Sequence, residues 1–121
     1  GEQVFINGDG LTSRDFCYIE NTVQMNILAA TAQDDAKAHV YNVAVGDRTT
    51  LNDLFSSIKS ALIASDVEIT QNAEYRDFRA GDVRHSQADV SKAIKNLGYT
   101  PSHRIQDGIL EAMPWYLKNV N

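Results

Sequence analysis

The sequence predicts a mixed α/β fold, and two neighbouring segments carry most of that prediction. Residues 39–45, HVYNVAV, are largely apolar, as expected of a strand buried on both faces of a parallel sheet. Thr50 is then a good helix N-cap, and apolar residues follow at spacings of three and four from Leu51 to Leu62. A lone buried strand needs neighbours that the rest of the chain does not obviously supply, so the pattern is typical of part of a larger fold.

Shorter elements are expected on both sides of these segments. Residues 4–6 predict a strand that ends at the turn Asn7-Gly8-Asp9-Gly10, and residues 15–19 predict a second short strand. A helix capped by Glu20 or Asn21 should follow, with Val23, Ile27 and Ala30 on one face. Residues 67–70 are a possible strand, and residues 71–87 are expected to be irregular.

Two more helices are predicted in the last third of the chain. Residues 89–97 have the length of a short helix, and Gly98 is a suitable C-terminal stop. A final helix carries one apolar stripe and contains Pro114, which removes a backbone donor. The stripe consists of Ile105, Ile109, Ala112, Met113 and Tyr116.

Composition limits the classes of function. The 121 residues are 43% hydrophobic and 22% charged, as in an ordinary globular domain, and the formal net charge of -5 argues against binding to nucleic acid or to a membrane surface. The single cysteine, Cys17, excludes an intrachain disulfide and favours a reducing cytoplasm. No apolar run could span a membrane. The chain starts at Gly1, as expected of a residue left by cloning or of a segment that begins inside a gene product.

Few motifs point to catalysis or to metal binding. The glycine pair in NGDG fits a plain turn or a phosphate-binding loop, although it lacks the spacing of a dinucleotide fingerprint. The three histidines, His39, His85 and His103, have no paired spacing, so no metal site is predicted. Cys17 lies in an apolar segment and is expected in the core.

The arginines are the strongest chemical signal. Arg14 follows a glycine-containing turn, and Arg79 lies in a glycine-containing loop with Asp82 close behind. Guanidinium groups bind phosphate in a bidentate manner, and a carboxylate accepts hydrogen bonds from sugar hydroxyls. The alternative is ordinary salt bridging, Arg14 to Asp15 or Arg79 to Asp82. Arg76 and Arg84 fit surface or salt-bridge positions.

Several motifs, in this order, resemble extended short-chain dehydrogenases/reductases of the NAD-dependent epimerase/dehydratase family. They are GDGLTSRDFCYIENTVQ, VYNVAVGDRTTLNDL, YRDFRAGDVRHSQADVSKAIKNLGYTP and AMPWYLK, and the most similar subgroup is UDP-N-acetylglucosamine 4-epimerase. The resemblance implies that residues 1–121 are the C-terminal, nucleotide-sugar-binding part of an incomplete Rossmann-type fold. The family's NAD loop and its Tyr-x-x-x-Lys pair have no counterpart in this sequence. No catalytic or cofactor-binding residue is therefore assigned, and the chain alone should be inactive.

The same resemblance implies roles for particular residues. Arg14 and Arg79 should hold the diphosphate of a UDP-sugar, and Asp82 should bind ribose hydroxyls. Phe5 and Asn7 should lie beside the uracil, mainly through backbone contacts.

Ser86 corresponds to a position that limits the sugar pocket in this family, and a small residue there favours N-acetylhexosamines. The implied partners are a UDP-sugar and, in the full-length protein, a second copy forming a homodimer, whereas the isolated chain is expected to self-associate. NAD would be bound outside this chain. A related nucleotide-sugar dehydratase or decarboxylase, or a stand-alone nucleotide-sugar-binding module without catalysis, is an alternative.

Overall fold

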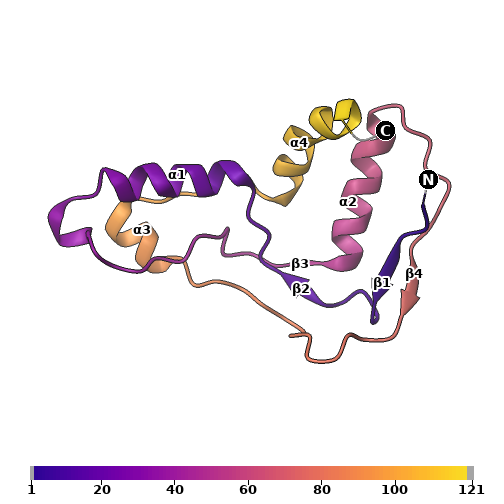
Figure 1. Cartoon of the computed structure of the whole chain (residues 1–121), viewed down its shortest axis with the longest axis horizontal. Coiled ribbons are helices and arrows are strands. Elements are labelled where there is room, and N and C mark those ends of the chain that lie inside the picture. Colours follow the sequence, from indigo (N-terminus) through magenta and orange to yellow (C-terminus); the bar gives the residue numbers. More distant parts are fainter. Residues whose placement is uncertain (1, 120–121) are drawn as a thin grey trace.

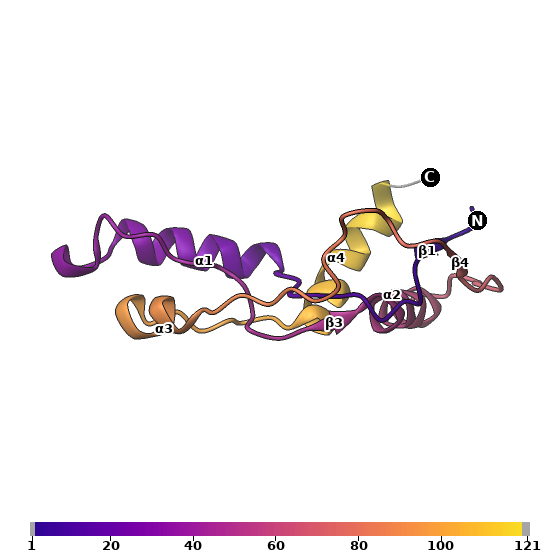
Figure 2. The same ribbon diagram turned by 90° about the horizontal axis from the view of Figure 1, so that it is seen from below.

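The computed structural model describes residues 2–119, which form an elongated α/β arrangement (Figure 1). Two views at right angles place α1 and α3 at one end and α2, α4, β1 and β4 at the other, with β2 and β3 between them (Figure 2). The elements in order are β1 (Phe5–Asn7), β2 (Ser13–Arg14), α1 (Ile19–Ala30), η1 (Asp34–Ala36), β3 (Thr49–Thr50), α2 (Leu51–Ala64), β4 (Glu74–Arg76), α3 (Ser91–Leu97) and α4 (Ile105–Asn119).

The strands form two small sheets. β1 pairs with β4 in parallel, and β2 pairs with β3 in antiparallel orientation. A single parallel bridge joins Ser13 to His85, so the chain that follows β4 returns beside β2. Segments far apart in the sequence, the turn after β1 and the loop after β4, are thereby brought to one edge of the molecule (Figure 1).

Helix α2 forms where its sequence predicts it. The hydroxyl of Thr50 accepts a hydrogen bond from the backbone N–H of Asp53 at 3.1 Å and donates one to the Asp53 carboxylate at 2.6 Å. This reciprocal cap satisfies a backbone donor that the first turn would leave unpaired. The predicted stop of α3 is also confirmed, because Gly98 adopts a left-handed φ of 67° as its C-cap.

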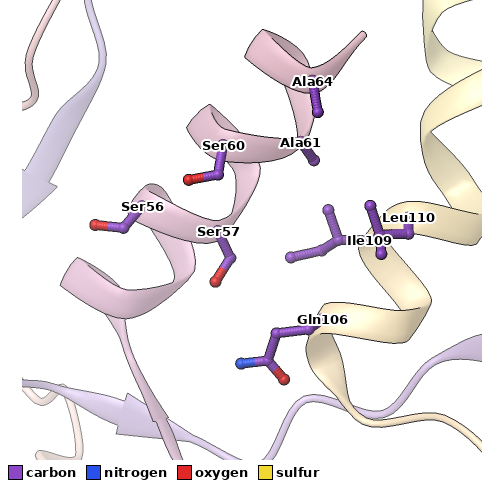
Figure 3. Close-up of a pocket in the computed structure, with 8 residues that line it drawn as sticks. All are labelled: Ser56, Ser57, Ser60, Ala61, Ala64, Gln106, Ile109 and Leu110. Carbon is purple, nitrogen blue, oxygen red and sulfur yellow. The ribbon is translucent and has the colours of Figure 1, made fainter.

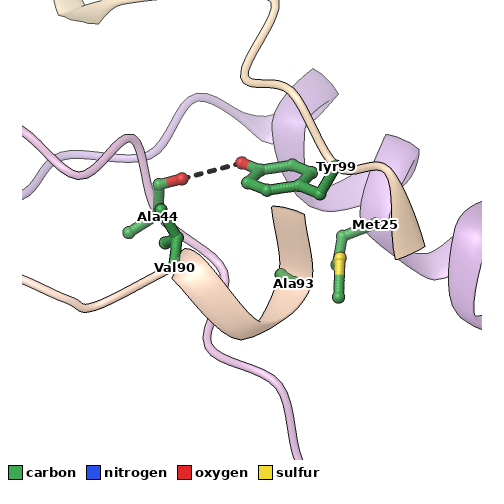
Figure 4. Packing of buried hydrophobic residues seen from close by; sticks show 5 residues of the cluster. All are labelled: Met25, Ala44, Val90, Ala93 and Tyr99. Carbon is green, nitrogen blue, oxygen red and sulfur yellow. Dashed lines mark hydrogen bonds between the residues drawn. The ribbon is translucent and has the colours of Figure 1, made fainter. Parts of the chain in front are cut away.

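A small apolar cluster holds α1, α3 and the connecting segments together (Figure 4). Its members are Met25, Ala44, Val90, Ala93 and Tyr99. Tyr99 is fully buried, and its hydroxyl donates a hydrogen bond to the carbonyl of Ala44 at 2.8 Å. Asn21, also fully buried, binds the backbone of Ser102 and His103 through its side-chain amide. These contacts fix the start of α4 against α1.

The strand predicted at residues 39–45 is wrong. No strand pairing involves this segment within residues 2–119, and Val40 is 86% exposed. A strand exists only with a hydrogen-bonded neighbour, which local apolar character does not supply. The segment is held instead by side chains, because the Asp15 carboxylate accepts hydrogen bonds from the backbone of Val45 and Gly46 at 3.0 Å each.

Three other local predictions also need correction. The second strand lies at Ser13–Arg14 rather than at residues 15–19, where Asp15 turns toward the backbone of the 45–46 segment. Residues 67–70 form no strand, because the chain leaves α2 through Asp66 with a positive φ of 61° and pairs with no strand in the described part. Within the region expected to be irregular, β4 forms by pairing with β1.

The buried face of α1 is not the face that carries Val23, Ile27 and Ala30. The helix begins at Ile19, and it buries Asn21 and Met25. Val23 and Ile27 are 42% and 59% exposed. The apolar face formed by Val23, Ile27 and Ala30 is therefore exposed in this chain.

None of the helices within residues 2–119 is long and apolar enough to cross a membrane.

Candidate functional site

A cavity of about 510 Å³ lies between β1, β2, the start of α2 and the loop at residues 77–86. Five of the six residues predicted from the sequence as ligand contacts line it: Phe5, Asn7, Arg14, Arg79 and Asp82. They come from three separate parts of the chain. The fold thus gathers side chains that the sequence separates by more than seventy positions.

The cavity has an apolar wall and a charged edge. The wall is supplied by α2, whose lining residues are Leu51, Leu54, Phe55 and Ile58. The charged edge consists of Arg14, Arg79 and Asp82. A flat apolar ring could lie against the wall while an attached anion meets the arginines, because ligand sites commonly combine an apolar lining with a few oriented polar groups.

Arg14 is oriented by two contacts. One guanidinium nitrogen donates to the Asp82 carboxylate at 2.5 Å, and the other donates to the carbonyl of Ser13 at 2.8 Å. The Arg14 and Asp82 side chains are 30% and 36% exposed, so this pair contributes little to stability. Its main consequence is geometric, because it brings the arginine of β2 against the aspartate of the loop.

The two salt bridges considered from the sequence are not those found. Arg14 pairs with Asp82 rather than with Asp15, and Asp82 is therefore engaged by Arg14 rather than by Arg79. Asp15 accepts hydrogen bonds from backbone N–H groups instead. The partner of Arg14 could not be predicted from local sequence, since Arg14 and Asp82 are 68 positions apart.

Ser86 does not line the cavity, although it lies next to its edge. Its backbone N–H donates to the carbonyl of Ser13 at 3.1 Å, the same carbonyl that receives Arg14. The Ser86 side chain is exposed. No role was assigned to Ser13 or His85 from the sequence, yet the buried Ser13 hydroxyl lies 2.9 Å from His85 Nδ1 and joins β2 to this part of the loop.

Arg76 contacts the cavity indirectly. Its guanidinium carbon lies 3.2 Å from the centre of the Phe5 ring, a cation–π contact on the rim. Arg84, expected like Arg76 at a surface or salt-bridge position, forms a salt bridge with Asp9 at 2.6 Å. The Arg84 hydrogen bond holds the pKa of the Asp9 carboxyl below its usual range.

Two further cavities lie between α2 and α4. Between α2 and α4 lies a space of about 420 Å³ in which Ile109 and Leu110 of α4 face the small residues of α2, such as Ala61 (Figure 3). A second, apolar space of about 500 Å³ lies between the same helices and residues 16–18, where it includes Cys17. Among residues 2–119, no group of three or more histidine, cysteine or acidic side chains could hold a metal ion.

Comparison with known proteins identifies the family. A family model described as GDP-mannose 4,6 dehydratase matches residues 1–112 of the 121. Curated relatives that match 93% or more of this chain carry the names of nucleotide-sugar 4-epimerases and 4,6-dehydratases. The chain spans about a third of the length of these relatives.

Solved structures agree with this assignment. UDP-glucose 4-epimerase of Thermotoga maritima, solved with UDP-glucose, superposes with a TM-score of 0.86 at 32% identity, over 99% of this chain and 36% of that one. UDP-N-acetylglucosamine 4-epimerase of Methanobrevibacter ruminantium M1, in complex with UDP-N-acetylmuramic acid, gives 0.82 at 31%, over 98% and 36%. A third solved protein, in complex with UDP-glucuronic acid and NAD, gives 0.83 at 28%, over 98% and 38%. The chain belongs to the nucleotide-sugar epimerase/dehydratase family of extended short-chain dehydrogenases/reductases.

Proposed function

We propose that residues 1–121 form the nucleotide-sugar-binding part of a UDP-N-acetylglucosamine 4-epimerase, which interconverts UDP-N-acetylglucosamine and UDP-N-acetylgalactosamine. The observation that carries this proposal is the cavity shared by Phe5, Asn7, Arg14, Arg79 and Asp82. Its apolar wall and the two arginines of its charged edge suit a nucleobase joined to a diphosphate.

Each lining residue has a role that follows from its chemistry. Arg14 and Arg79 hold the diphosphate, since guanidinium groups bind phosphate oxygens with directed hydrogen bonds. Asp82 accepts hydrogen bonds from the ribose hydroxyls, because its carboxylate has more acceptor positions than the Arg14 contact uses. Phe5 and Asn7 lie beside the uracil at the end of β1, where α2 supplies the apolar wall.

NAD does not fit the described part of this chain. The glycine pair Gly8 and Gly10 lies in a turn from β1 to β2, whereas a dinucleotide-binding loop leads from a strand into a helix. NAD, which supplies hydride transfer at C4 of the hexose, would therefore be held by another part of the enzyme. This chain's residues bind and orient the nucleotide, so that the sugar can turn while the diphosphate stays fixed.

The preference for an N-acetylated sugar rests on Ser86. A small side chain at this exposed position leaves room for a 2-acetamido group, which a large aromatic residue would exclude. The similarity to a solved UDP-N-acetylglucosamine 4-epimerase supports the same choice. A 4,6-dehydratase is the second candidate, because the matching family model carries that description.

Turnover of the complete enzyme tests the proposal. Incubated with UDP-N-acetylglucosamine, the enzyme should form UDP-N-acetylgalactosamine at unchanged total mass, which chromatography with mass spectrometry resolves. A product lighter by one water would identify a dehydratase. A product lighter by carbon dioxide, formed from a UDP-uronic acid, would identify a decarboxylase.

Arg79→Ala tests the assignment of the diphosphate site. Loss of a charged hydrogen bond should weaken UDP binding by about 1.5–3 kcal/mol, or roughly 10- to 150-fold in Kd, measured by isothermal titration calorimetry. Arg104→Ala is the matched control, since Arg104 pairs with Asp47 and does not line the cavity. Unchanged UDP affinity in Arg79→Ala would remove the diphosphate assignment.

A further inference from the structure

The loop at residues 77–86 carries two proposed ligand contacts without a regular element to hold them. Its ends are tied by backbone hydrogen bonds, Gly8 N–H to the Arg76 carbonyl at 2.8 Å and Ser13 N–H to the Arg84 carbonyl at 2.9 Å. Between these ends, the Asp82 N–H donates to the Arg79 carbonyl at 3.2 Å in a turn at Gly81. The position of Arg79 and Asp82 must therefore depend on side-chain contacts made by the loop.

One such contact joins Arg84 to the turn after β1. An Arg84 guanidinium nitrogen lies 2.6 Å from Asp9 Oδ2. The other Asp9 oxygen accepts the backbone N–H of Leu11 at 2.9 Å. Because Asp9 is fixed by its own turn, the ion pair anchors the end of the loop to a defined point beside β1.

Phe78 makes the second contact, at the start of the loop. Its ring lies over Gly8, where an added Cβ would come within 2.3 Å of a ring carbon. The Arg84 guanidinium carbon lies 5.2 Å from the centre of the same ring. Phe78 thus contacts both the turn and the arginine, and only glycine at position 8, with its φ of 81°, permits this approach.

We propose that Asp9, Phe78 and Arg84 form a clasp that positions Arg79 for the diphosphate and Asp82 for the ribose of the nucleotide. The inference rests on the proposed function. None of the three clasp residues is among those that line the cavity, so they act through the loop rather than on the ligand. They are positioning residues.

The exposure of the clasp separates positioning from stability. The Arg84 and Asp9 side chains are 43% and 42% exposed, and an ion pair in such surroundings adds little to folding. Removing it should therefore change ligand affinity more than thermal stability. If the ion pair had only a structural role, removing it would change both UDP affinity and thermal stability, or neither of them.

The test is UDP binding to the complete enzyme, measured by titration calorimetry. Arg84→Gln and Asp9→Asn should each weaken UDP about 3- to 10-fold, with melting temperatures close to that of the parent. Arg84→Lys should retain most of the affinity, because the contact is a single N–O pair that an ammonium can replace. Arg104→Gln removes an ion pair of the same length, 2.6 Å, away from the cavity and should bind UDP normally.

A double-variant cycle decides whether the clasp acts through Arg79. In an Arg79→Ala background, Arg84→Gln should cause a smaller loss than in the parent enzyme, because one of the two groups that it positions is gone. Additive losses, or unchanged UDP affinity in Arg84→Gln while Arg79→Ala weakens it, would overturn the clasp and leave the proposed function standing. Failure of the parent enzyme to bind UDP would overturn both.

Discussion

Ser86 is the position at which one side chain would set the size of the proposed sugar pocket. Its backbone N–H is bound to Ser13, and its side chain is exposed, so a larger residue can be introduced without disturbing the fold. Ser86→Tyr should lower kcat/KM for UDP-N-acetylglucosamine about 10- to 200-fold and that for UDP-glucose far less. Ser86→Ala controls for loss of the hydroxyl at similar size. Equal losses on both substrates in Ser86→Tyr would refute the steric role.

Tyr99 predicts a pH dependence of stability. Burial raises the pKa of its phenol to about 12, against an ordinary value of 10.0. Between these values the folded state binds more protons than the unfolded state, so the contribution of Tyr99 is complete below pH 10 and declines as the pH rises to 12. Urea unfolding should show Tyr99→Phe less stable than the parent by about 0.5–1.5 kcal/mol below that window. The difference should shrink within it, and a constant difference would contradict this prediction.

At single positions, the kind of ligand group that a residue could bind was easier to predict from the sequence than its hydrogen-bond or salt-bridge partner. Arg14, Arg79 and Asp82 carry groups suited to a nucleotide wherever they lie, and the fold places them on one cavity. The partner of Arg14 depends on how the loop folds back, which local sequence does not encode. The backbone-binding role of Asp15 had no sequence signal either, since its acceptor function depends on the path of residues 45–46.

At the level of elements, the cap of α2 gives a direct stability prediction. Thr50→Ala removes the acceptor for the Asp53 N–H and should lower the free energy of unfolding by about 0.5–2 kcal/mol. Thr49→Ala is the matched control, because Thr49 contributes to β3 through its backbone pairing with Arg14. Chemical denaturation measures both variants, and equal effects would show that the cap is not the cause.

Elements whose signals are local were predicted, and those that need a distant partner were not. The Thr50 cap and the Gly98 stop are contained within a few residues of their helices. β4 is three exposed residues that become a strand only by pairing with β1, 69 positions away. Residues 39–45 show the converse, since their apolar character suits a buried strand and the described part of the chain offers it no neighbour.

Across the molecule as a whole, large apolar side chains are exposed to solvent on several elements. Ile27 on α1, Val40 in the segment before β3, and Trp115 on α4 are 59%, 86% and 61% exposed. Exposed apolar surface of this extent is typical of surfaces that another part of a protein covers. The chain also spans only about a third of its relatives. We therefore expect residues 1–121, produced alone, to self-associate.

Sedimentation velocity tests this expectation, because association shifts the weight-average sedimentation coefficient upward with protein concentration. Ile27→Lys and Trp115→Lys should each reduce the shift by placing a charge on an apolar face. Lys95→Gln, which changes an exposed residue of α3, should not. The complete enzyme of the proposed function should not associate through these faces, since the rest of its chain would cover them. A monomeric chain that melts cooperatively and binds UDP would instead support the stand-alone binding module, because it could then hold a nucleotide without any other part of an enzyme.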